Sequence, residues 1–334
     1  MAREKKYNAV ITGLGMYFPE KIYDNKYFES IIDTNDEWIL TRTGIKERRI
    51  LENGATSDLA TNAALDLMQR HNVSAEEIDC IIIATVTPDM LFPATACLVQ
   101  NRIGAVNAWG FDLEAACSGF LFAFQTGCAL VESGQYKKVL VIGADKMSSI
   151  VDYTDRNNCI LFGDGGAALL LEPSEDYNLG LQDFILRIDG AGEGALHMKG
   201  GGSLNPPTHE TVDKKMHYLY QDGKAVFKVA VKGMADVSYE LMQKNNLKSE
   251  DIAYLVPHQA NLRIIDATAQ RMGLSKEKVM INIDRYGNTT AATIPSCLAE
   301  YYRAGKLKKG DKIILSAFGA GYTWGATYVV WAID

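Results

Sequence analysis

Short, continuously apolar runs alternate with segments of helical periodicity along the whole chain, and few architectures accommodate that order. The apolar runs lie at 7–15, 78–86, 138–143, 167–171, 252–256, 313–317 and 326–331. Segments with apolar residues at helical spacing lie between them, at 57–71, 119–132, 264–272 and 296–304. A strand that is apolar throughout is typically buried on both faces. The pattern therefore predicts an α/β protein with a largely parallel sheet that is covered by helices.

Two of the predicted helices carry further detail. Ser57 is predicted as the N-cap of the helix at 57–71, because a serine hydroxyl can accept a hydrogen bond from a free N–H of the first turn. A later helix is marked by apolar residues on one face, namely Phe227, Ala230, Met234, Val237 and Leu241. Their spacing indicates a helix that packs this face against a core.

The second half of the chain repeats the order of the first. Two pairs of segments resemble each other at an offset of about 174 residues, namely 78–83 with 252–257 and 137–143 with 310–316. At a similar offset of 171, Cys117 aligns with Asn288, and both residues open runs of small residues typical of helix starts. Such a duplication predicts a pseudo-two-fold arrangement in which two helix N-termini meet.

Two polar stretches interrupt the pattern. The stretch at 172–180 predicts a boundary between one half at 1–175 and another at 176–334. A second segment, from Gly190 to Asp222, is rich in glycine and proline. It is too long for a simple connection, so we interpret it as a functional loop or lid, with a disordered excursion as the alternative.

Composition disfavours several classes of protein. A formal net charge of -7 and a pI of about 5.4 lack the basic footprint of a nucleic-acid binder. The apolar runs are far shorter than the ~20 residues that span a bilayer, and the N-terminus carries no signal-peptide pattern, so we expect a cytoplasmic protein without a membrane segment. The six cysteines are scattered without zinc spacing, so neither disulfides nor a metal site is expected.

Cys117 is the first candidate for chemistry, because it stands just before a predicted apolar helix. A thiol at a helix N-terminus faces free N–H groups and the positive end of the helix dipole, and both favour the nucleophilic thiolate. The small residues Ser118 and Gly119 would let a substrate carbonyl approach the backbone. Taken alone, a cysteine before a helix is more often structural, so the local sequence leaves both interpretations open.

Two polar residues and a glycine-rich stretch are further candidates. His258 follows a predicted strand that ends at Pro257, and α/β proteins build their sites at such carboxyl ends. A histidine that only caps or bonds the backbone is the alternative. Asn288 follows a glycine and equally fits an ordinary turn or helix cap. The stretch 317–325 is either a loop of backbone donors or a plain hairpin.

Four motifs in a fixed order make the set specific. They are 107–120 around Cys117, 256–261 around His258, 286–295 around Asn288, and the glycine-rich 318–325. Together they resemble the β-ketoacyl-acyl-carrier-protein synthase III family, the initiating condensing enzymes of bacterial fatty-acid synthesis. The resemblance covers essentially the whole chain, including 11–15 and 35–45. It implies a thiolase-like duplicated α/β fold, with five αβαβα layers and two mixed sheets, that forms a homodimer.

The resemblance also implies roles for residues at matching positions. Cys117 matches the acyl-accepting nucleophile, and His258 and Asn288 match the two decarboxylation residues. The backbone of Cys117, Gly319 and Ala320 matches the oxyanion hole, although some relatives have glycine in place of Ala320. Residues that match the coenzyme A tunnel are Trp38, Arg42, Arg156, Phe227 and Asn261.

Two sets of matching positions concern neighbouring proteins. Phe92 matches a residue that reaches the acyl pocket of the adjacent subunit. Lys228, Arg263 and Arg271 match a basic patch that docks acyl carrier protein, but Gln270 stands where some relatives have a basic residue. The segment 196–220 is longer than in short relatives, and its role stays open.

The implied reaction has two stages. Cys117 would accept an acyl group, most simply acetyl, from acyl-coenzyme A. Malonyl-acyl carrier protein would then lose carbon dioxide, and its enolate would attack the Cys117 thioester to give 3-oxoacyl-acyl carrier protein. No metal or redox cofactor is implied, because the loss of carbon dioxide drives formation of the carbon–carbon bond.

Several alternatives are weighed against this reaction. A related condensing enzyme could take a longer or branched primer or serve secondary metabolism. A degradative thiolase would need a second cysteine near 317–325, and a hydroxymethylglutaryl-coenzyme A synthase would need a catalytic glutamate further upstream than Glu114. A non-catalytic acyl-coenzyme A-binding relative is disfavoured by the intact cysteine, histidine and asparagine.

Overall fold

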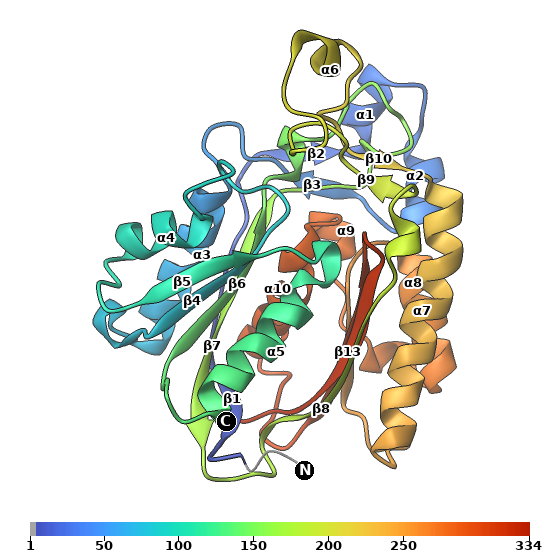
Figure 1. The fold of residues 1–334 in the computed structure, drawn as a ribbon. Coiled ribbons are helices and arrows are strands. Elements are labelled where there is room, and N and C mark those ends of the chain that lie inside the picture. The colour runs from blue at the N-terminus through green and yellow to red at the C-terminus, as the bar shows by residue number, and fades with distance from the viewer. Residues whose placement is uncertain (1–4) are drawn as a thin grey trace.

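The computed structural model describes residues 5–334 and arranges them around two mixed β-sheets (Figure 1). The first sheet has the order β1-β7-β6-β4-β5, with bounds Asn8–Tyr17, Gly165–Ser174, Val139–Asp145, Cys80–Ala84 and Trp109–Leu113. The second has the order β11-β12-β13-β8, with bounds Tyr254–Pro257, Lys312–Gly319, Thr323–Val330 and Gly180–Ile188. Two short strand pairs lie above them in Figure 1, β2 (Ile22–Asp24) with β3 (Glu47–Arg49) and β9 (Leu196–His197) with β10 (Tyr220–Gln221).

The helices divide into α-helices and short 3₁₀ turns. The α-helices are α1 (Asn25–Ile31), α2 (Asp36–Thr43), α3 (Thr56–His71), α4 (Thr95–Ile103), α5 (Gly119–Glu132), α6 (His209–Asp213), α7 (Gly223–Lys244), α8 (Leu262–Met272), α9 (Ile283–Tyr286) and α10 (Thr293–Arg303). The 3₁₀ turns are η1 (Ala75–Glu77), η2 (Ala116–Ser118), η3 (Met147–Ser149), η4 (Gly190–Gly192), η5 (Lys276–Lys278) and η6 (Thr290–Ala292). Within residues 5–334, no helix combines the length and apolarity needed to cross a bilayer. The start of the chain, where no signal peptide is expected, falls partly on residues 1–4, outside the described residues.

The elements stack in five layers (Figure 1). Helices α3 and α4 cover the outer face of the first sheet, and α7 and α8 cover the outer face of the second. Helices α5 and α10 fill the space between the two sheets. The predicted five-layer architecture with two mixed sheets is therefore confirmed.

The expectation of a largely parallel sheet is wrong for both sheets. Strands β4, β5 and β6 run parallel, as do β11 and β12, whereas β1, β7, β8 and β13 pair antiparallel. β1, β7 and β13 are apolar because other elements cover both of their faces. Continuous apolarity thus reports burial rather than strand direction.

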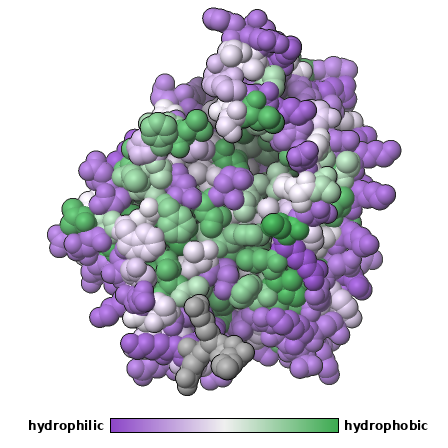
Figure 2. All heavy atoms as spheres, in the orientation of Figure 1, coloured by the Kyte–Doolittle hydropathy of each residue, from purple (hydrophilic) through white to green (hydrophobic). Residues whose placement is uncertain are grey.

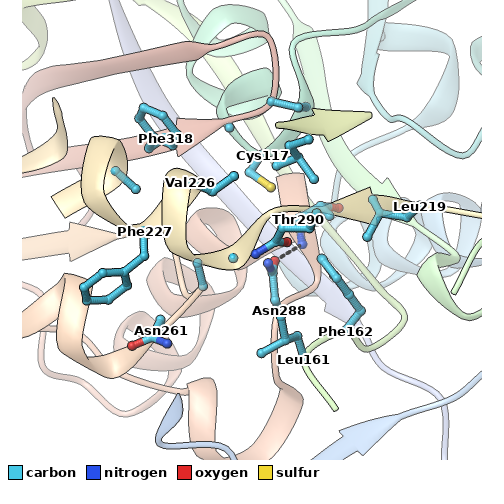
Figure 3. Close-up of a pocket in the computed structure, with 18 of the residues that line it drawn as sticks. Cys117, Leu161, Phe162, Leu219, Val226, Phe227, Asn261, Asn288, Thr290 and Phe318 are labelled. Carbon is cyan, nitrogen blue, oxygen red and sulfur yellow. Dashed lines mark hydrogen bonds between the residues drawn. The ribbon is translucent and has the colours of Figure 1, made fainter. Parts of the chain in front are cut away.

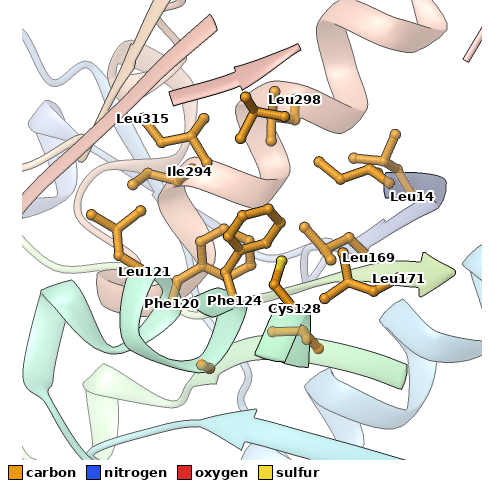
Figure 4. Close-up of a cluster of buried hydrophobic side chains, with 14 of the residues drawn as sticks. Leu14, Phe120, Leu121, Phe124, Cys128, Leu169, Leu171, Ile294, Leu298 and Leu315 are labelled. Atoms are coloured by element: carbon orange, nitrogen blue, oxygen red, sulfur yellow. The ribbon is translucent and has the colours of Figure 1, made fainter. Parts of the chain in front are cut away.

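The central layer carries the largest core. Phe120 and Phe124 on α5 and Ile294 and Leu298 on α10 lie between the strands of both sheets (Figure 4). All four side chains are buried. Burial of a side chain of this size contributes about 1.5–3 kcal/mol, so the core that joins the halves is a substantial part of the stability. The predicted boundary at 175/176 falls in the connection between β7 and β8, and this core crosses it.

Both sheets repeat one topology. The order β1-β7-β6-β4 in the first sheet matches β8-β13-β12-β11 in the second, with the same parallel and antiparallel pairings. Where the first sheet continues with β5, the second has an isolated parallel bridge between Leu255 and Val279. The duplication read from the sequence is thus present in the strand order itself.

The two turns that precede the central helices are also equivalent. η2 leads into α5 and η6 leads into α10, and Ala116 and Thr290 at their starts have positive φ angles of 48° and 50°. These residues are related by the same offset of about 174 that relates the strands. The predicted alignment of Cys117 with Asn288 is therefore wrong by three residues, because Asn288 is equivalent to Glu114.

The start of helix α3 differs from the prediction. Helix α5 spans the predicted residues, but α3 begins at Thr56 with Ala55 as its N-cap. The Asp58 carboxylate accepts the Ala55 N–H, so Ser57 is not needed as a cap. The Ser57 hydroxyl instead donates to Asp89 at 2.5 Å.

The glycine- and proline-rich segment is folded. β9 and β10 pair antiparallel at its base, and α6 lies near its tip, at the top of Figure 1. The Lys215 ammonium contacts the Asp152 carboxylate at 2.7 Å, and the Leu219 N–H donates to the Ile150 carbonyl at 2.8 Å. The segment is therefore fixed to the loop that follows β6, and the alternative of a disordered excursion is wrong.

Candidate active site

A pocket of about 1220 Å³ opens at the carboxyl ends of β11 and β12, next to the segment that carries β9 and β10 (Figure 3). The structure brings three predicted residues together in its wall. Cys117 comes from η2, His258 directly follows β11, and Asn288 lies two residues before the start of η6. Each half of the fold therefore contributes to one cavity.

Cys117 is fixed by hydrogen bonds that cross between the halves. The Ser118 hydroxyl donates to the Thr323 carbonyl at 3.0 Å, and the Thr323 hydroxyl donates to the Ala115 carbonyl at 2.8 Å. These bonds tie both sides of Cys117 to the start of β13. The thiol points into the pocket toward Asn288 (Figure 3).

The environment of the thiol favours its neutral form. Burial raises the pKa of Cys117 to about 12, and the negative charge of Asp145 acts in the same direction. The N–H of Cys117 and the side chain of Asn288 lower the pKa, but by less than burial raises it. The N–H group at the helix start favours the thiolate as predicted, but removal of the sulfur from water outweighs it.

His258 is buried, and only one of its ring nitrogens has a protein partner among the described residues. Nδ1 lies 2.7 Å from the Thr293 hydroxyl, while Nε2 has no protein partner, and the residue lines the pocket. Burial lowers the pKa of His258 to about 3, so the ring is neutral at pH 7. A neutral imidazole carries one proton, and its position decides whether Nε2 donates or accepts.

The orientation of the Asn288 amide is set by the turn that follows it. Its Oδ1 accepts the N–H of Thr290 at 2.9 Å, which leaves the Nδ2 amino group as a donor. The Asn288 backbone is held on both sides, with its N–H on the Leu161 carbonyl at 2.9 Å and its carbonyl on the Gly163 N–H at 3.1 Å. The amide is thus a preorganised donor at the pocket wall.

The equivalent turn before Cys117 uses the same device. The Glu114 Oε1 accepts the N–H of Ala116 at 3.0 Å, as Asn288 does for Thr290. A residue other than glycine with positive φ costs about 1–3 kcal/mol and persists only where its surroundings hold it. In both turns, a side-chain oxygen two residues earlier supplies part of that hold.

Of the two structures that the sequence left open for the stretch 317–325, the hairpin is present. It is an antiparallel hairpin of β12 and β13, and its turn packs against η2. A Cβ on Gly319 would lie 2.7 Å from the Cys117 nitrogen and 3.0 Å from the Ser118 nitrogen. Only glycine therefore leaves space beside the Cys117 N–H, while the neighbouring Ala320 lines the pocket.

The mouth of the pocket combines aromatic and basic groups. The guanidinium groups of Arg42 and Arg156 lie 4.7 Å and 5.2 Å from the centre of the Trp38 ring. The Asn261 amide donates to the Arg42 carbonyl at 2.9 Å, which joins α8 to the end of α2. Arg263 lies over the ring of Phe227 at 4.7 Å. Flat rings beside cations suit a nucleotide with phosphate groups.

Other predicted site residues lie outside the pocket wall. Arg156 pairs with the exposed Asp33 at 3.3 Å, and Phe92 is 83% exposed. Lys228 is exposed on α7, and Arg271 pairs with Asp236 at 3.3 Å. Arg263 was grouped with these two in the basic patch, yet it lines the pocket mouth. Among the described residues, no group of three or more histidine, cysteine or acidic side chains is arranged to hold a metal ion.

Residues that the sequence analysis missed hold the site residues in place through hydrogen bonds. The buried Asp145 accepts from the hydroxyls of Thr85, Thr87 and Thr290. It thereby holds the residue that bonds the Asn288 amide. Thr293 was also missed. It lies in the motif at 286–295, three residues after Thr290, and this spacing of two hydroxyl side chains was a signal that the sequence offered.

The comparisons with known proteins identify the family of this chain. Residues 111–190 match the family described as 3-oxoacyl-[acyl-carrier-protein] synthase III, and residues 242–331 match its C-terminal part. The beta-ketoacyl-[acyl-carrier-protein] synthase III of Chlorobaculum tepidum is 60% identical over 97% of this chain and 99% of its own length. The chain belongs to this family.

Solved structures show the same fold. The 3-oxoacyl-[acyl-carrier-protein] synthase III of Aquifex aeolicus is 43% identical, with a TM-score of 0.90 over 97% of this chain and 100% of its own. A priming β-ketosynthase from a polyketide pathway is 32% identical, with a TM-score of 0.90 over 99% and 98%. The resemblance read from the motifs is confirmed, together with the thiolase-like fold and the acyltransferase class.

We expect the alkylation of Cys117 by iodoacetamide to be slow at pH 7 and to increase about tenfold with each pH unit to pH 10 or above. The pKa of this thiol is raised to about 12, so the fraction of reactive thiolate is still increasing at pH 10. An ordinary thiol, with a pKa of about 8.5, is already ionised at that pH. Mass spectrometry of the Cys117 peptide measures the rate, with the exposed Cys97 as internal control. A rate that levels off below pH 9 would contradict the raised pKa.

Proposed function

We propose that this chain catalyses the initiating condensation of bacterial fatty-acid synthesis, with Cys117 as nucleophile and His258 and Asn288 as decarboxylation residues. The observation that carries the proposal is the convergence of these three side chains in one pocket from three separate turns. Membership of the synthase III family supports the condensing reaction itself.

In the first half-reaction, Cys117 takes an acyl group from acyl-coenzyme A. Its sulfur adds to the thioester carbonyl, and the coenzyme leaves as the free thiol. The negative charge that develops on the carbonyl oxygen is met by the Cys117 N–H and by the backbone at Gly319 and Ala320. The space beside the Cys117 nitrogen, which a Cβ on Gly319 would fill, supports this placement.

In the second half-reaction, the malonyl group of malonyl-acyl carrier protein enters the pocket and loses carbon dioxide. The resulting enolate carbon attacks the Cys117 thioester, the Cys117 sulfur leaves, and 3-oxoacyl-acyl carrier protein forms. The enolate oxygen needs hydrogen-bond donors, and Asn288 and His258 both line the pocket, with Nδ2 and Nε2 available to serve it. Because decarboxylation drives the bond formation, the chemistry calls for no metal or redox cofactor.

Coenzyme A would bind along the mouth of the pocket. Trp38 and Arg42 offer a flat ring and a cation at one side, and Phe227, Asn261 and Arg263 form the other. Arg156 would join them from the surface, where it already contacts the Trp38 ring. The adenine ring and phosphates of the coenzyme suit this combination.

A homodimer agrees with the exposed apolar groups on the loop between β4 and α4, beside the first sheet. Leu91 and Phe92 are 81% and 83% exposed in the single chain, and β5 lies at the edge of its sheet. Figure 2 shows apolar side chains gathered across the middle of the face where Figure 1 draws β5 and α5. A second copy that pairs at β5 would cover this face and could place Phe92 in its partner's acyl pocket.

Acyl carrier protein would dock on the basic face of α7. Lys224, Lys228 and Lys232 are all exposed and follow one another at intervals of four residues, which places them in one row on the helix. Arg271 lies on the adjacent helix α8. Because carrier proteins are acidic, such a row can steer the malonyl substrate toward the pocket.

The proposed function predicts that acetyl-coenzyme A transfers one acetyl group to Cys117 and that malonyl-acyl carrier protein then discharges it with release of carbon dioxide. Intact-protein mass after brief incubation, followed by peptide mapping, measures the first step. Cys117→Ala should fold and form no adduct. An acyl group trapped on that variant, or none on the reduced native protein with any thioester, would refute the assignment.

The same experiment separates the native primer from its alternative. The pocket wall includes the apolar Val86, Met147, Ile160 and Phe162, which could also accept a longer chain. Adducts from branched or medium-chain acyl-coenzyme A, with none from acetyl-coenzyme A, would keep the mechanism and change the primer.

Gly319→Ala should reduce the acylation rate of Cys117 by about 10²-fold or more, because the added methyl group would lie against the Cys117 nitrogen at 2.7 Å. Quenched-flow mass spectrometry measures the rate. Ala320→Gly is the matched control one residue away and should acylate close to the native rate, because a backbone donor survives this change. Native-rate acylation of folded Gly319→Ala would remove this loop from the oxyanion hole.

Lys228→Glu should raise the KM for malonyl-acyl carrier protein more than it slows acetylation by acetyl-coenzyme A, through lost charge complementarity, and the effect should weaken in high salt. Steady-state kinetics with each substrate varied in turn measures both. Lys308→Glu is the control, since Lys308 precedes β12 at the end opposite Gly319. Equal effects on both substrates would place Lys228 outside the docking surface.

A further inference from the structure

The Thr293 hydroxyl connects His258 to the turn that carries Asn288. Its oxygen lies 2.7 Å from Nδ1 of His258 and 2.9 Å from the carbonyl oxygen of Thr290. Both contacts are buried, and Nδ1 has no other protein partner among the described residues. This hydroxyl therefore decides what the buried ring can do.

The two contacts together fix the position of the imidazole proton. A carbonyl oxygen only accepts, so in the contact with Thr290 the Thr293 hydroxyl must be the donor. Having one proton, the hydroxyl can then only accept from His258. Both contacts are hydrogen bonds together only when Nδ1 carries the proton and donates it. Nε2 then carries a lone pair with no protein partner, on a residue that lines the pocket.

We propose that Thr293 is a positioning residue that holds His258 in the Nδ1–H tautomer, so that Nε2 accepts the proton of the Cys117 thiol during acylation. The inference rests on the proposed function and deepens it, since it assigns His258 a role in activating the nucleophile as well as in decarboxylation.

The proton balance of both half-reactions follows from this tautomer. In acylation, Nε2 takes the proton from the Cys117 sulfur as that sulfur bonds to the acyl carbon, and returns it to the sulfur of the departing coenzyme. Condensation consumes one proton overall. Nε2 takes this proton from solvent through the open pocket once the malonyl group brings negative charge, donates a hydrogen bond to the enolate oxygen, and delivers the proton to the Cys117 sulfur as it leaves.

The surroundings of both groups agree with this role. The Cys117 thiol is neutral at pH 7, so an acceptor for its proton is needed when it attacks. His258 is also neutral at that pH, so its lone pair is available. The Nδ1 side of the ring is closed by Thr293 and Thr290, and the Thr290 carbonyl has no proton to relay. The tautomer is therefore kept through the cycle.

The direct test is nitrogen-15 NMR of the full-length native protein labelled at histidine, with His258→Gln used to assign the His258 signals. The proposal expects a protonated Nδ1 and a bare Nε2 in the resting enzyme. A native ring protonated on Nε2 would overturn the inference without reference to any variant.

Two variants test the function of the hydroxyl. Thr293→Val keeps the shape of the side chain without the hydroxyl, so the proton should move to Nε2 and single-turnover acylation should fall by about 10²-fold or more. Decarboxylation of malonyl-acyl carrier protein should fall less, because Nε2–H still donates. Thr293→Ser restores the hydroxyl and should recover both the Nδ1–H signature and most of the acylation rate.

The outcomes separate this inference from the proposed function. If the native protein forms an acyl-enzyme and condenses while folded Thr293→Val acylates at the native rate, only the role of Thr293 fails. If the native protein forms no acyl-enzyme with any thioester, the proposed function fails and the inference falls with it. Should Thr293→Val not fold, the native NMR spectrum and Thr293→Ser still decide the question.

Discussion

Two turns with left-handed backbone meet between the sheets, and the geometry of the site depends on how closely they fit. One carries Cys117 and the other follows Asn288, and each is held by a side-chain oxygen two residues before its strained residue. The fit also needs a residue without a side chain in β6, since a Cβ on Gly143 would lie 2.2 Å from the Ala291 carbonyl oxygen. Close packing of the halves therefore comes first, and the positions of the reactive groups follow from it.

Much of the fold was predictable because buried segments consist largely of apolar residues. The strands that are buried on both faces are continuously apolar, so the sequence predicted them. The bounds of α5 were predicted because its apolar periodicity ends at a serine and a glycine. β8 was not found, because this edge strand is buried only at its start and its short apolar stretches are interrupted by Gln182, Asp183 and Arg187. Strand direction was also lost, since apolarity reports only what covers a strand.

The candidate site was predictable only where a motif marked it. Cys117, His258 and Asn288 stood in recognisable segments, and the structure brings them into one pocket. The groups that control them did not stand out: Asp145 and Thr293 are ordinary residues until the fold places them beside Thr290 and His258. The raised pKa of Cys117 could not be predicted for the same reason, because desolvation depends on the whole cavity.

The two turns of the site are separated by about half of the chain, which has a consequence for biosynthesis. A chain is made from its N-terminus, so Cys117 is synthesised long before Thr290 and the hairpin of β12 and β13. Contacts between segments so distant in sequence form late in folding. Until η6 docks, the cysteine lacks both the Asn288 amide and a closed cavity. An unfinished chain therefore carries the proposed nucleophile without the residues proposed to act with it.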